Sequence, residues 1–129
     1  MPEMGWTHEE IYLLADRGYA LYRQGRYQEA AVIFEGLTAL DPLNPYCRTA
    51  LAAVCLALGD AERAVNELSF LLNLNPADHE ARARRCEAYC QLRNWSEARR
   101  DLAILHRNGE RHHAQRLTWR LQAGGVPIQ

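Results

Sequence analysis

Two cysteines one helical turn apart, Cys86 and Cys90, come closest in this chain to the spacing of a metal site. Together with His106, His112 and His113 further along, they could offer the thiolate and imidazole ligands that Zn²⁺ prefers. Cys86, however, falls where each unit of an internal repeat carries a small residue between two helices, and a thiol in such a place behaves as a small hydrophobic side chain. We therefore predict no metal ion and no other cofactor.

The sequence lacks the common catalytic patterns. It contains no Gly-rich phosphate loop, no Gly-x-Ser-x-Gly turn and no carboxylate pair at a spacing suited to acid–base chemistry. We therefore predict that the protein is not an enzyme and has no catalytic residues.

Three tyrosines lie on one face of the first predicted helix: Tyr12, Tyr19 and Tyr22. Each combines a large apolar ring with a hydroxyl that can hydrogen-bond a peptide backbone, which suits a protein-binding surface. The alternative is that one or more of them pack against the N-terminal segment or a neighbouring helix.

An internal repeat of 34 residues positions these side chains. Its members share one offset along the chain: Gly25 and Gly59; Asp41-Pro42 and Asn75-Pro76; Ala30, Ala64 and Ala98. A period of this length, with Ala-x3-Phe and a proline eight residues later, is typical of the tetratricopeptide repeat, which the chain resembles. The resemblance implies an all-α superhelix of helix pairs, a fold that binds proteins.

The repeat predicts three helix pairs and a capping helix in a single domain, residues 1–123. The helices are expected near residues 8–23, 27–40, 45–58, 61–74, 79–91, 95–107 and 110–122, and the repeats at about 11–44, 45–78 and 79–110. Thr7-x2-Glu10 predicts a capping box at the start of the first helix. The last helix is expected to cover the apolar side of the third pair, and residues 124–129 to form a flexible tail.

The repeat positions also predict the core. Small residues are expected where the helices of a pair approach closely: Gly18, Ala52 and Cys86 on the first helices, and Ala30, Ala64 and Ala98 on the second. Leucines at helical spacing are expected to form the core between repeats: Leu37, Leu40, Leu71 and Leu74.

The first helix of each pair is expected to line a concave groove. Its inward positions are Tyr12, Ala15, Tyr19, Tyr22 and Arg23 in repeat one, Tyr46, Thr49, Ala53, Leu56 and Ala57 in repeat two, and Glu80, Ala83, Glu87, Cys90 and Gln91 in repeat three. This lining, aromatic at one end and polar at the other, fits an extended segment of a protein partner. Replacing Tyr19 and Tyr22 by Ala is expected to abolish binding and leave melting nearly unchanged.

The net charge of −1 hides an asymmetry along the chain. Residues 1–78 hold 5 Arg and 11 acidic residues, a net of −6, whereas residues 79–129 hold 10 Arg and 5 acidic residues, a net of +5. A basic stripe can track phosphates. The acidic residues interspersed among these arginines favour instead a solvated helix face or a contact with an acidic patch on a protein partner. We predict no nucleic-acid binding.

Targeting signals are missing from the sequence. The N-terminus lacks the basic start and apolar stretch of a secretory signal, and no apolar run is long enough to span a bilayer. We therefore expect a cytoplasmic protein without membrane insertion, in which the four cysteines are free thiols: Cys47, Cys55, Cys86 and Cys90.

Three stretches resemble the tetratricopeptide-repeat chaperones of bacterial type III secretion systems: Phe34-x2-Leu37-x2-Leu40-Asp41, Leu51-Ala-Ala-Val-Cys55 and Glu87-x3-Gln91-Leu92. Chaperones of this family hold an extended segment of a secretion subunit in their groove before export. The resemblance implies a bacterial cytoplasmic chaperone that prevents premature association of its subunit. It also implies which residues anchor the segment: Tyr19 and Tyr22 first, with Ala53, Leu56, Glu87 and Gln91 further along.

Several properties of such a chaperone stay open at this stage. The subunit is either a translocator or a needle or early substrate, a second small chaperone is an optional partner, and the protein is either a monomer or a homodimer. A general adaptor for another protein complex is the second hypothesis. Adaptors that grip the C-terminal carboxylate of heat-shock chaperones need Lys, Asn and Arg at groove positions that here hold Ala15, Tyr19, Ala50 and Glu80.

Overall fold

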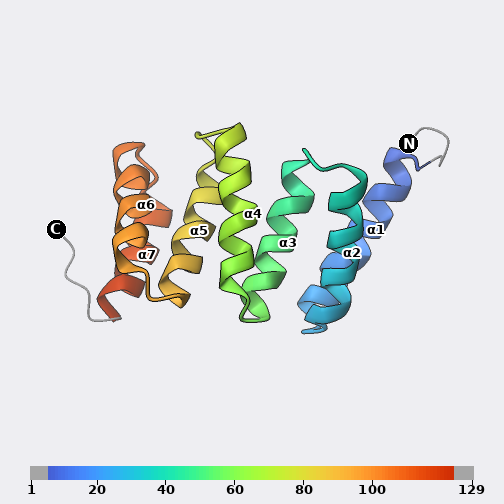
Figure 1. Ribbon diagram of the computed structural model, residues 1–129, viewed down its shortest axis with the longest axis horizontal. Coiled ribbons are helices and arrows are strands. Elements are labelled where there is room, and N and C mark those ends of the chain that lie inside the picture. Colours follow the sequence, from blue (N-terminus) through green and yellow to red (C-terminus); the bar gives the residue numbers. More distant parts are fainter. Residues whose placement is uncertain (1–5, 124–129) are drawn as a thin grey trace.

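The computed structural model describes residues 6–123, and this part of the chain consists of seven α-helices without a β-strand. The helices follow one another in a row (Figure 1): α1 (His8–Arg23), α2 (Tyr27–Leu40), α3 (Pro45–Ala57), α4 (Ala61–Leu74), α5 (His79–Gln91), α6 (Trp95–Arg107) and α7 (Arg111–Ala123). The predicted all-α architecture is confirmed, and each helix end lies within one residue of its predicted place. The tail predicted over 124–129 lies outside the described residues. Within them, no helix combines the length and apolarity needed to cross a membrane.

Polar side chains at the helix starts explain where the helices begin. The Thr7 hydroxyl accepts a hydrogen bond from the Glu10 amide at 3.1 Å, and the Glu10 carboxylate accepts one from the Thr7 amide at 2.9 Å. The predicted capping box is therefore present. Asn44, Asp60 and Asp78 cap α3, α4 and α5 through their side-chain oxygens, satisfying amides that have no partner within the helix.

A left-handed residue follows the first helix of each pair. Gly25 and Gly59 adopt φ angles of 78° and 84°, which glycine tolerates because it has no Cβ. Arg93 occupies the equivalent place after α5 with a φ of 58°. The third repeat thus makes the same turn with a side chain that disfavours it.

Small residues lie where the helices of each pair cross. Ala30, Ala64 and Ala98 are fully buried, and so are the predicted small residues of the first helices. A Cβ atom at Gly18 would lie 2.8 Å from the Phe34 ring, so this position has no room for a side chain. The predicted small positions are confirmed.

The prediction of a leucine core is only half right. Leu37 and Leu71 are buried, but Leu40 and Leu74 are 41% and 55% exposed. Each exposed leucine is the last residue of its helix, where the chain turns into the link between repeats. The helical spacing places them on the core side, but the helix ends before the next repeat can cover them.

An arginine with little exposed surface connects each link between repeats to the helix pair that follows. Arg48 of α3 pairs with Glu67 of α4 at 2.7 Å and donates to the carbonyl oxygen of the proline six residues earlier at 2.6 Å. Arg82, 34 residues later, pairs with Asp101 of α6 at 3.3 Å and donates to the corresponding proline carbonyl at 2.9 Å. The 34-residue repeat is therefore present in the polar contacts as well as in the small residues.

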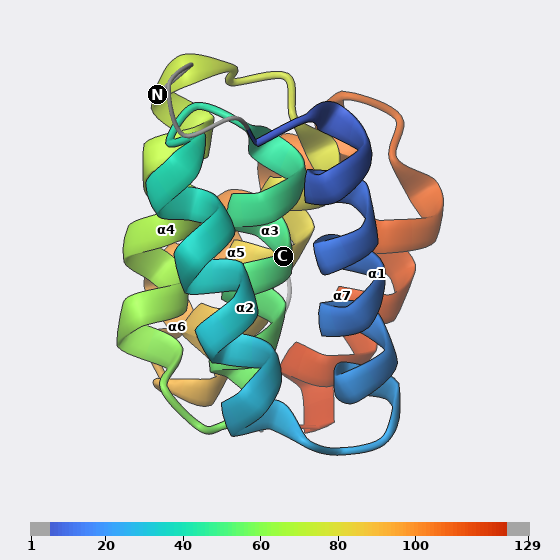
Figure 2. The same ribbon diagram turned by 90° about the vertical axis from the view of Figure 1, so that its right-hand side faces the viewer.

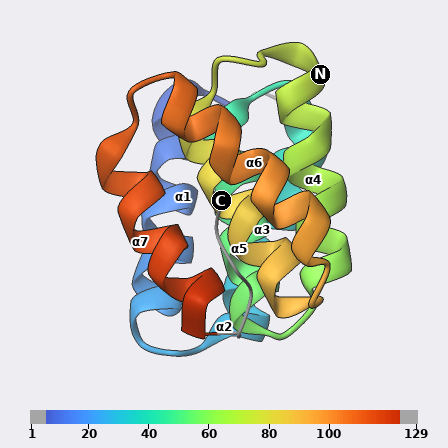
Figure 3. The ribbon, with the colours of Figure 1, turned by 90° about the vertical axis from the view of Figure 1, so that its left-hand side faces the viewer.

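The second helices of the pairs lie along one side of the array. In Figure 2, α2, α4 and α6 lie on one side, α1 and α7 on the other, and α3 and α5 between them. Figure 3 shows α4 and α6 opposite α1 and α7 from the other end. Because α5 contacts both α6 and α7, α7 continues the layer of first helices. The predicted groove belongs to the face that α1, α3 and α5 share.

Candidate peptide-binding groove

The middle of the predicted groove is a small hollow between α1, α3 and α5. Tyr19 and Tyr22 of α1 and Thr49 and Ala53 of α3 line it, and its volume is about 50 Å³. Arg84 of α5 completes the lining. The hollow therefore joins side chains from three successive repeats, which is the arrangement that an extended segment lying across the array would contact.

The tyrosines of this hollow also belong to the packing of the first repeat. The Tyr19 ring meets the Phe34 ring edge-on at 5.7 Å and lies 5.6 Å from Tyr46, and Tyr22 lies 5.5 Å from Tyr27. Both tyrosines of α1 are half-buried against the core. Tyr19 and Tyr22 therefore pack against a neighbouring helix, which was the alternative interpretation, and they also line the hollow. Because such aromatic pairs contribute about 0.5–1.5 kcal/mol each, Ala at both positions is expected to lower stability, contrary to the initial expectation.

Tyr46 contributes to the groove a phenol group that stays protonated. Burial, followed by the neighbouring Tyr19, raises the pKa of Tyr46 to about 12. The Tyr46 hydroxyl is therefore neutral at physiological pH and can donate a hydrogen bond to a backbone carbonyl of a bound segment.

A second hollow, of about 360 Å³, lies at the N-terminal end of the same layer. Tyr12, Ala15 and Tyr46 from the predicted groove line it together with residues of the α1 start and the α2–α3 link: His8, Ile11, Asp41, Asn44 and Cys47. Tyr12 is 69% exposed, so its ring is free to contact a partner. The aromatic end of the predicted groove is thus an open surface.

α7 engages the polar end of the predicted groove. Glu87 of α5 pairs with Arg116 of α7 at 2.6 Å, and Glu80 lies 3.5 Å from His113 of the same helix. The Gln91 side chain donates to a backbone carbonyl of α3 at 3.4 Å. Glu80, Glu87 and Gln91, which were expected to contact a partner, therefore already contact α7 or α3. The open part of the surface is concentrated on α1, α3 and the first half of α5.

Some residues predicted to line the groove are buried instead: Ala15, Leu56, Ala83 and Cys90. Ala83 and Cys90 pack in the cluster that α7 completes with its apolar side chains. Ala15 and Leu56 belong to the larger cluster of the first two repeats. The prediction therefore included residues at the edges of the groove face that the adjacent helices cover. Arg23 and Ala57 remain exposed at the ends of their helices.

Arg84 is the groove residue that the sequence prediction missed. It lies 34 residues after Ala50, which also lines the central hollow, so the repeat offset contains the signal. Its guanidinium Nε lies 3.5 Å from the Glu80 carboxylate one turn earlier. The groove therefore has a cation beside its tyrosines, held by a single carboxylate.

Cys86 and Cys90 are part of the core. Among the described residues, no three His, Cys, Asp or Glu side chains come close enough to hold a metal ion. The Cys86 thiol donates to the Ala98 carbonyl at 3.3 Å. Its hydrogen bond with Cys90, and then burial, raise the pKa of Cys86 well above the usual range for a thiol. Cys86 therefore stays protonated, whereas a metal ion requires a thiolate.

Half of the ten arginines after residue 78 take part in ion pairs: Arg82 and Arg85 with Asp101, Arg84 with Glu80, Arg100 with Glu97, and Arg116 with Glu87. Arg82 is also buried. The basic stripe of the sequence is therefore interrupted by internal pairs, and much of its charge serves the fold.

Comparison with known proteins agrees with this architecture. Residues 21–72 match the sequence profile described as "Tetratricopeptide repeat". The chain is 32% identical over 100 residues to the TPR repeat-containing thioredoxin TTL4 of Arabidopsis thaliana, a stretch that is 78% of this chain and 15% of that protein. The chain therefore spans only a small part of the length of this relative.

Solved structures with the same fold include type III secretion chaperones and a TPR domain bound to a peptide. PcrH from Pseudomonas aeruginosa superposes with a TM-score of 0.81 at 21% identity, covering 92% of this chain and 94% of PcrH. The Yersinia enterocolitica type III secretion translocator chaperone SycD gives 0.80 at 19% identity, covering 91% of each chain. The first TPR of Spaghetti (RPAP3), bound to an HSP90 peptide, gives 0.79 at 24% identity, covering 93% and 97%. The chain therefore has the tetratricopeptide-repeat fold, and its structural neighbours include the type III secretion chaperones that its sequence resembles.

Proposed function

We propose that this protein binds an extended segment of a protein partner across α1, α3 and α5, and that it is a chaperone of the bacterial cytoplasm. Its partner would be a type III secretion subunit, held before export so that it does not associate prematurely. The observation that carries the proposal is the central hollow, where Tyr19, Tyr22, Thr49 and Ala53 meet Arg84. The fold shared with PcrH, which has been solved in complex with the chaperone binding regions of PopB and PopD, supports it.

The groove suits reversible protection of an apolar segment. The tyrosine rings cover apolar side chains, while their hydroxyls bond the extended backbone that such a segment exposes. A segment of this size is expected to bind at micromolar strength, which corresponds to about −8 kcal/mol. Binding of this strength covers an aggregation-prone segment in the cell and still allows it to dissociate when the export machinery takes it up.

A general adaptor remains the second candidate. It is favoured by the similarity to a plant thioredoxin with TPR repeats and to the HSP90-peptide-bound repeat of Spaghetti. The two candidates share the groove and differ in the identity of the partner, so one experiment separates them.

The test uses a variant that fills the groove without removing core packing. Ala53→Arg places a long side chain in the central hollow, whereas Tyr19 and Tyr22 support the core and are less suitable. Val32→Arg is the matched control, because Val32 is 68% exposed on α2, away from the hollow. Val32→Arg should melt like the wild type, since exposed substitutions usually change stability by no more than about 0.5 kcal/mol. Ala53 is half-buried, so a larger stability change is expected for Ala53→Arg, and binding is compared at a temperature where circular dichroism shows both variants folded.

Wild type and both variants are used to retain proteins from a lysate of the native organism, and the retained proteins are identified by mass spectrometry. An amphipathic secretion subunit held by wild type and Val32→Arg, but lost with Ala53→Arg, supports the chaperone. Partners of other classes with the same dependence support the adaptor. Retention that Ala53→Arg does not change refutes the groove for either candidate.

A further inference from the structure

α7 occupies the place of the first helix of a fourth repeat. Its buried Ala114 and Leu121 lie 33 residues after Ala81 and Ala88, which are buried at the equivalent places in α5. The offset is one residue short of 34, because the chain between Ala98 and Ala114 is one residue shorter than the chain between the equivalent Ala64 and Ala81. α7 therefore buries the face that each first helix turns toward the preceding repeat.

The face of α7 that a second helix would cover is open. The same offset places Gln115 and Trp119 at the positions of Arg82 and Cys86, whose side chains both bond α6, the second helix of their pair. In the described part of the chain no helix follows α7. Trp119 is accordingly 64% exposed.

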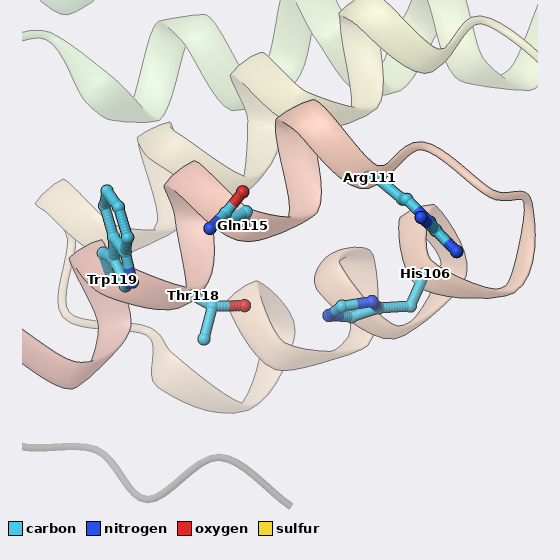
Figure 4. Close-up of a pocket in the computed structure, with 5 residues that line it drawn as sticks. All are labelled: His106, Arg111, Gln115, Thr118 and Trp119. Carbon is cyan, nitrogen blue, oxygen red and sulfur yellow. The ribbon is translucent and has the colours of Figure 1, made fainter.

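A hollow of about 430 Å³ lies at this face (Figure 4). We name it the α7 outer face, and it is lined by His106 of α6 and by Arg111, Gln115, Thr118 and Trp119 of α7. In the close-up, Trp119 stands at one end of the hollow and His106 and Arg111 at the other. An apolar anchor and two basic groups are therefore presented on a single surface.

The charge of the α7 outer face indicates what covers it. Among the described residues that line it, two are basic and none is acidic. Glu110, the acidic residue just before α7, lies 3.9 Å from His79 instead. In repeats two and three, an arginine of the first helix pairs with a carboxylate of the second helix, Glu67 or Asp101. In α7 the equivalent residue is Gln115, and the basic groups of the surface are Arg111 and the adjacent His106. A helix that docks here is therefore expected to bring acidic side chains to Arg111 and His106.

We propose that the α7 outer face binds an acidic amphipathic helix of a partner protein. Its apolar stripe covers Trp119, and its carboxylates pair with His106 and Arg111. Trp119 replaces the small residues Ala52 and Cys86 of the earlier pairs, so the partner helix lies beside the indole and not as close as the second helices do. The site is separate from the groove, because the groove side of α7 is the side whose Arg116 bonds α5.

The proposal is tested with a displayed pool of helical peptides of 14 residues, the length of α2 and α4. The pool is randomised at all positions that do not maintain the helix, and it is selected in parallel on the full-length wild type and on Trp119→Ala. Peptides enriched only on wild type are then measured one by one by fluorescence anisotropy. Trp6→Ala, which removes an exposed tryptophan at the other end of the array, is the matched control.

The expected peptides carry apolar residues at helical spacing flanked by Asp or Glu. They should bind at least tenfold more weakly to Trp119→Ala and to Arg111→Glu, and lose affinity when their acidic residues become Lys. Trp6→Ala and the groove variant Ala53→Arg should leave their binding unchanged, which separates this site from the proposed function. Arg111→Glu decides the matter if Trp119→Ala proves unstable by circular dichroism.

Other results overturn the proposal. No enrichment that depends on Trp119, or enrichment of peptides without acidic residues, shows that the surface does not take an acidic helix. A mass that rises with protein concentration in light scattering and falls with Trp119→Ala assigns the surface to a second copy of this chain. A single-stranded oligonucleotide that displaces the enriched peptides assigns it to nucleic acid.

Discussion

Asp101→Asn is the substitution for which the structure predicts the largest loss of stability at a polar position. Asp101 is 1% exposed and accepts from Arg85 at 2.7 and 2.9 Å and from Arg82 at 3.3 Å. The amide keeps the shape of the carboxylate but removes its charge, so two arginines lose the anion that compensates them. Breaking a buried ion pair from one side costs about 3–5 kcal/mol.

The magnitude decides how the effect is measured. With total stabilities of about 5–15 kcal/mol, the variant should remain folded at low temperature and show a clearly lower urea midpoint by far-UV circular dichroism. Its melting temperature should fall by about 10 °C for a loss near 3 kcal/mol in a chain of this length.

Glu67→Gln is the matched control, because Glu67 holds the same position one repeat earlier. It pairs with a single arginine at 2.7 Å, and its side chain is 17% exposed. Losing one charge-assisted hydrogen bond should cost about 1.5–3 kcal/mol. If Asp101→Asn destabilises the protein no more than Glu67→Gln does, Asp101 does not compensate the charges of both Arg82 and Arg85.

Three further predictions concern local conformation and pH. Gly18→Ala should destabilise the protein by about 1–3 kcal/mol, because the new Cβ would lie 2.8 Å from the Phe34 ring. Gly36→Ala, whose Cβ would have no atom within 4 Å, should stabilise α2 by about 0.5–1 kcal/mol. Urea midpoints of the two variants that move in the same direction would contradict this. Arg93→Gly should raise the melting temperature by relieving a left-handed residue, a gain of up to about 1 kcal/mol, and a lower melting temperature would count against it. Because the pKa of Tyr46 is raised to about 12, its contribution to stability is fully present below its ordinary pKa near 10 and is lost as the pH rises toward 12. Tyr46→Phe should flatten this part of the pH profile, and an unchanged slope would show that Tyr46 does not cause it.

The repeat period accounts for most of what the sequence predicted correctly. Small residues recurring at one offset can only be explained by close helix pairs, and Gly18, Ala52 and Cys86 are all buried there. Capping residues at the same offset fix the helix starts, which is why their predicted positions hold to within a residue. Both signals are local, because they depend on contacts within one repeat and its link.

The errors concern contacts that extend beyond a single repeat. Leu40 and Leu74 have the right spacing for a core, but only the three-dimensional path of the chain shows that their helices end too early to be covered. The pair between Glu87 and Arg116 depends on how α7 lies against α5, which the periodicity of the sequence does not contain. The structure therefore brings Tyr19, Tyr22, Thr49 and Ala53 together at one hollow, as the repeat spacing implies, while the contacts of α7 with α5 are not contained in that spacing.

Trp119 shows how a break in the repeat can carry information of its own. The pattern predicts a small residue at this position, and a helix pair could not form around an indole there. Exposure alone would not set Trp119 apart, since Tyr12, Leu13 and Val32 are exposed to a similar degree. Its place at a hollow that Arg111 also lines, where a second helix would otherwise pack, is the reason to expect contact with another molecule. The rule that identifies the core in three repeats thus identifies, where it fails in the fourth, the surface at which a binding site is expected.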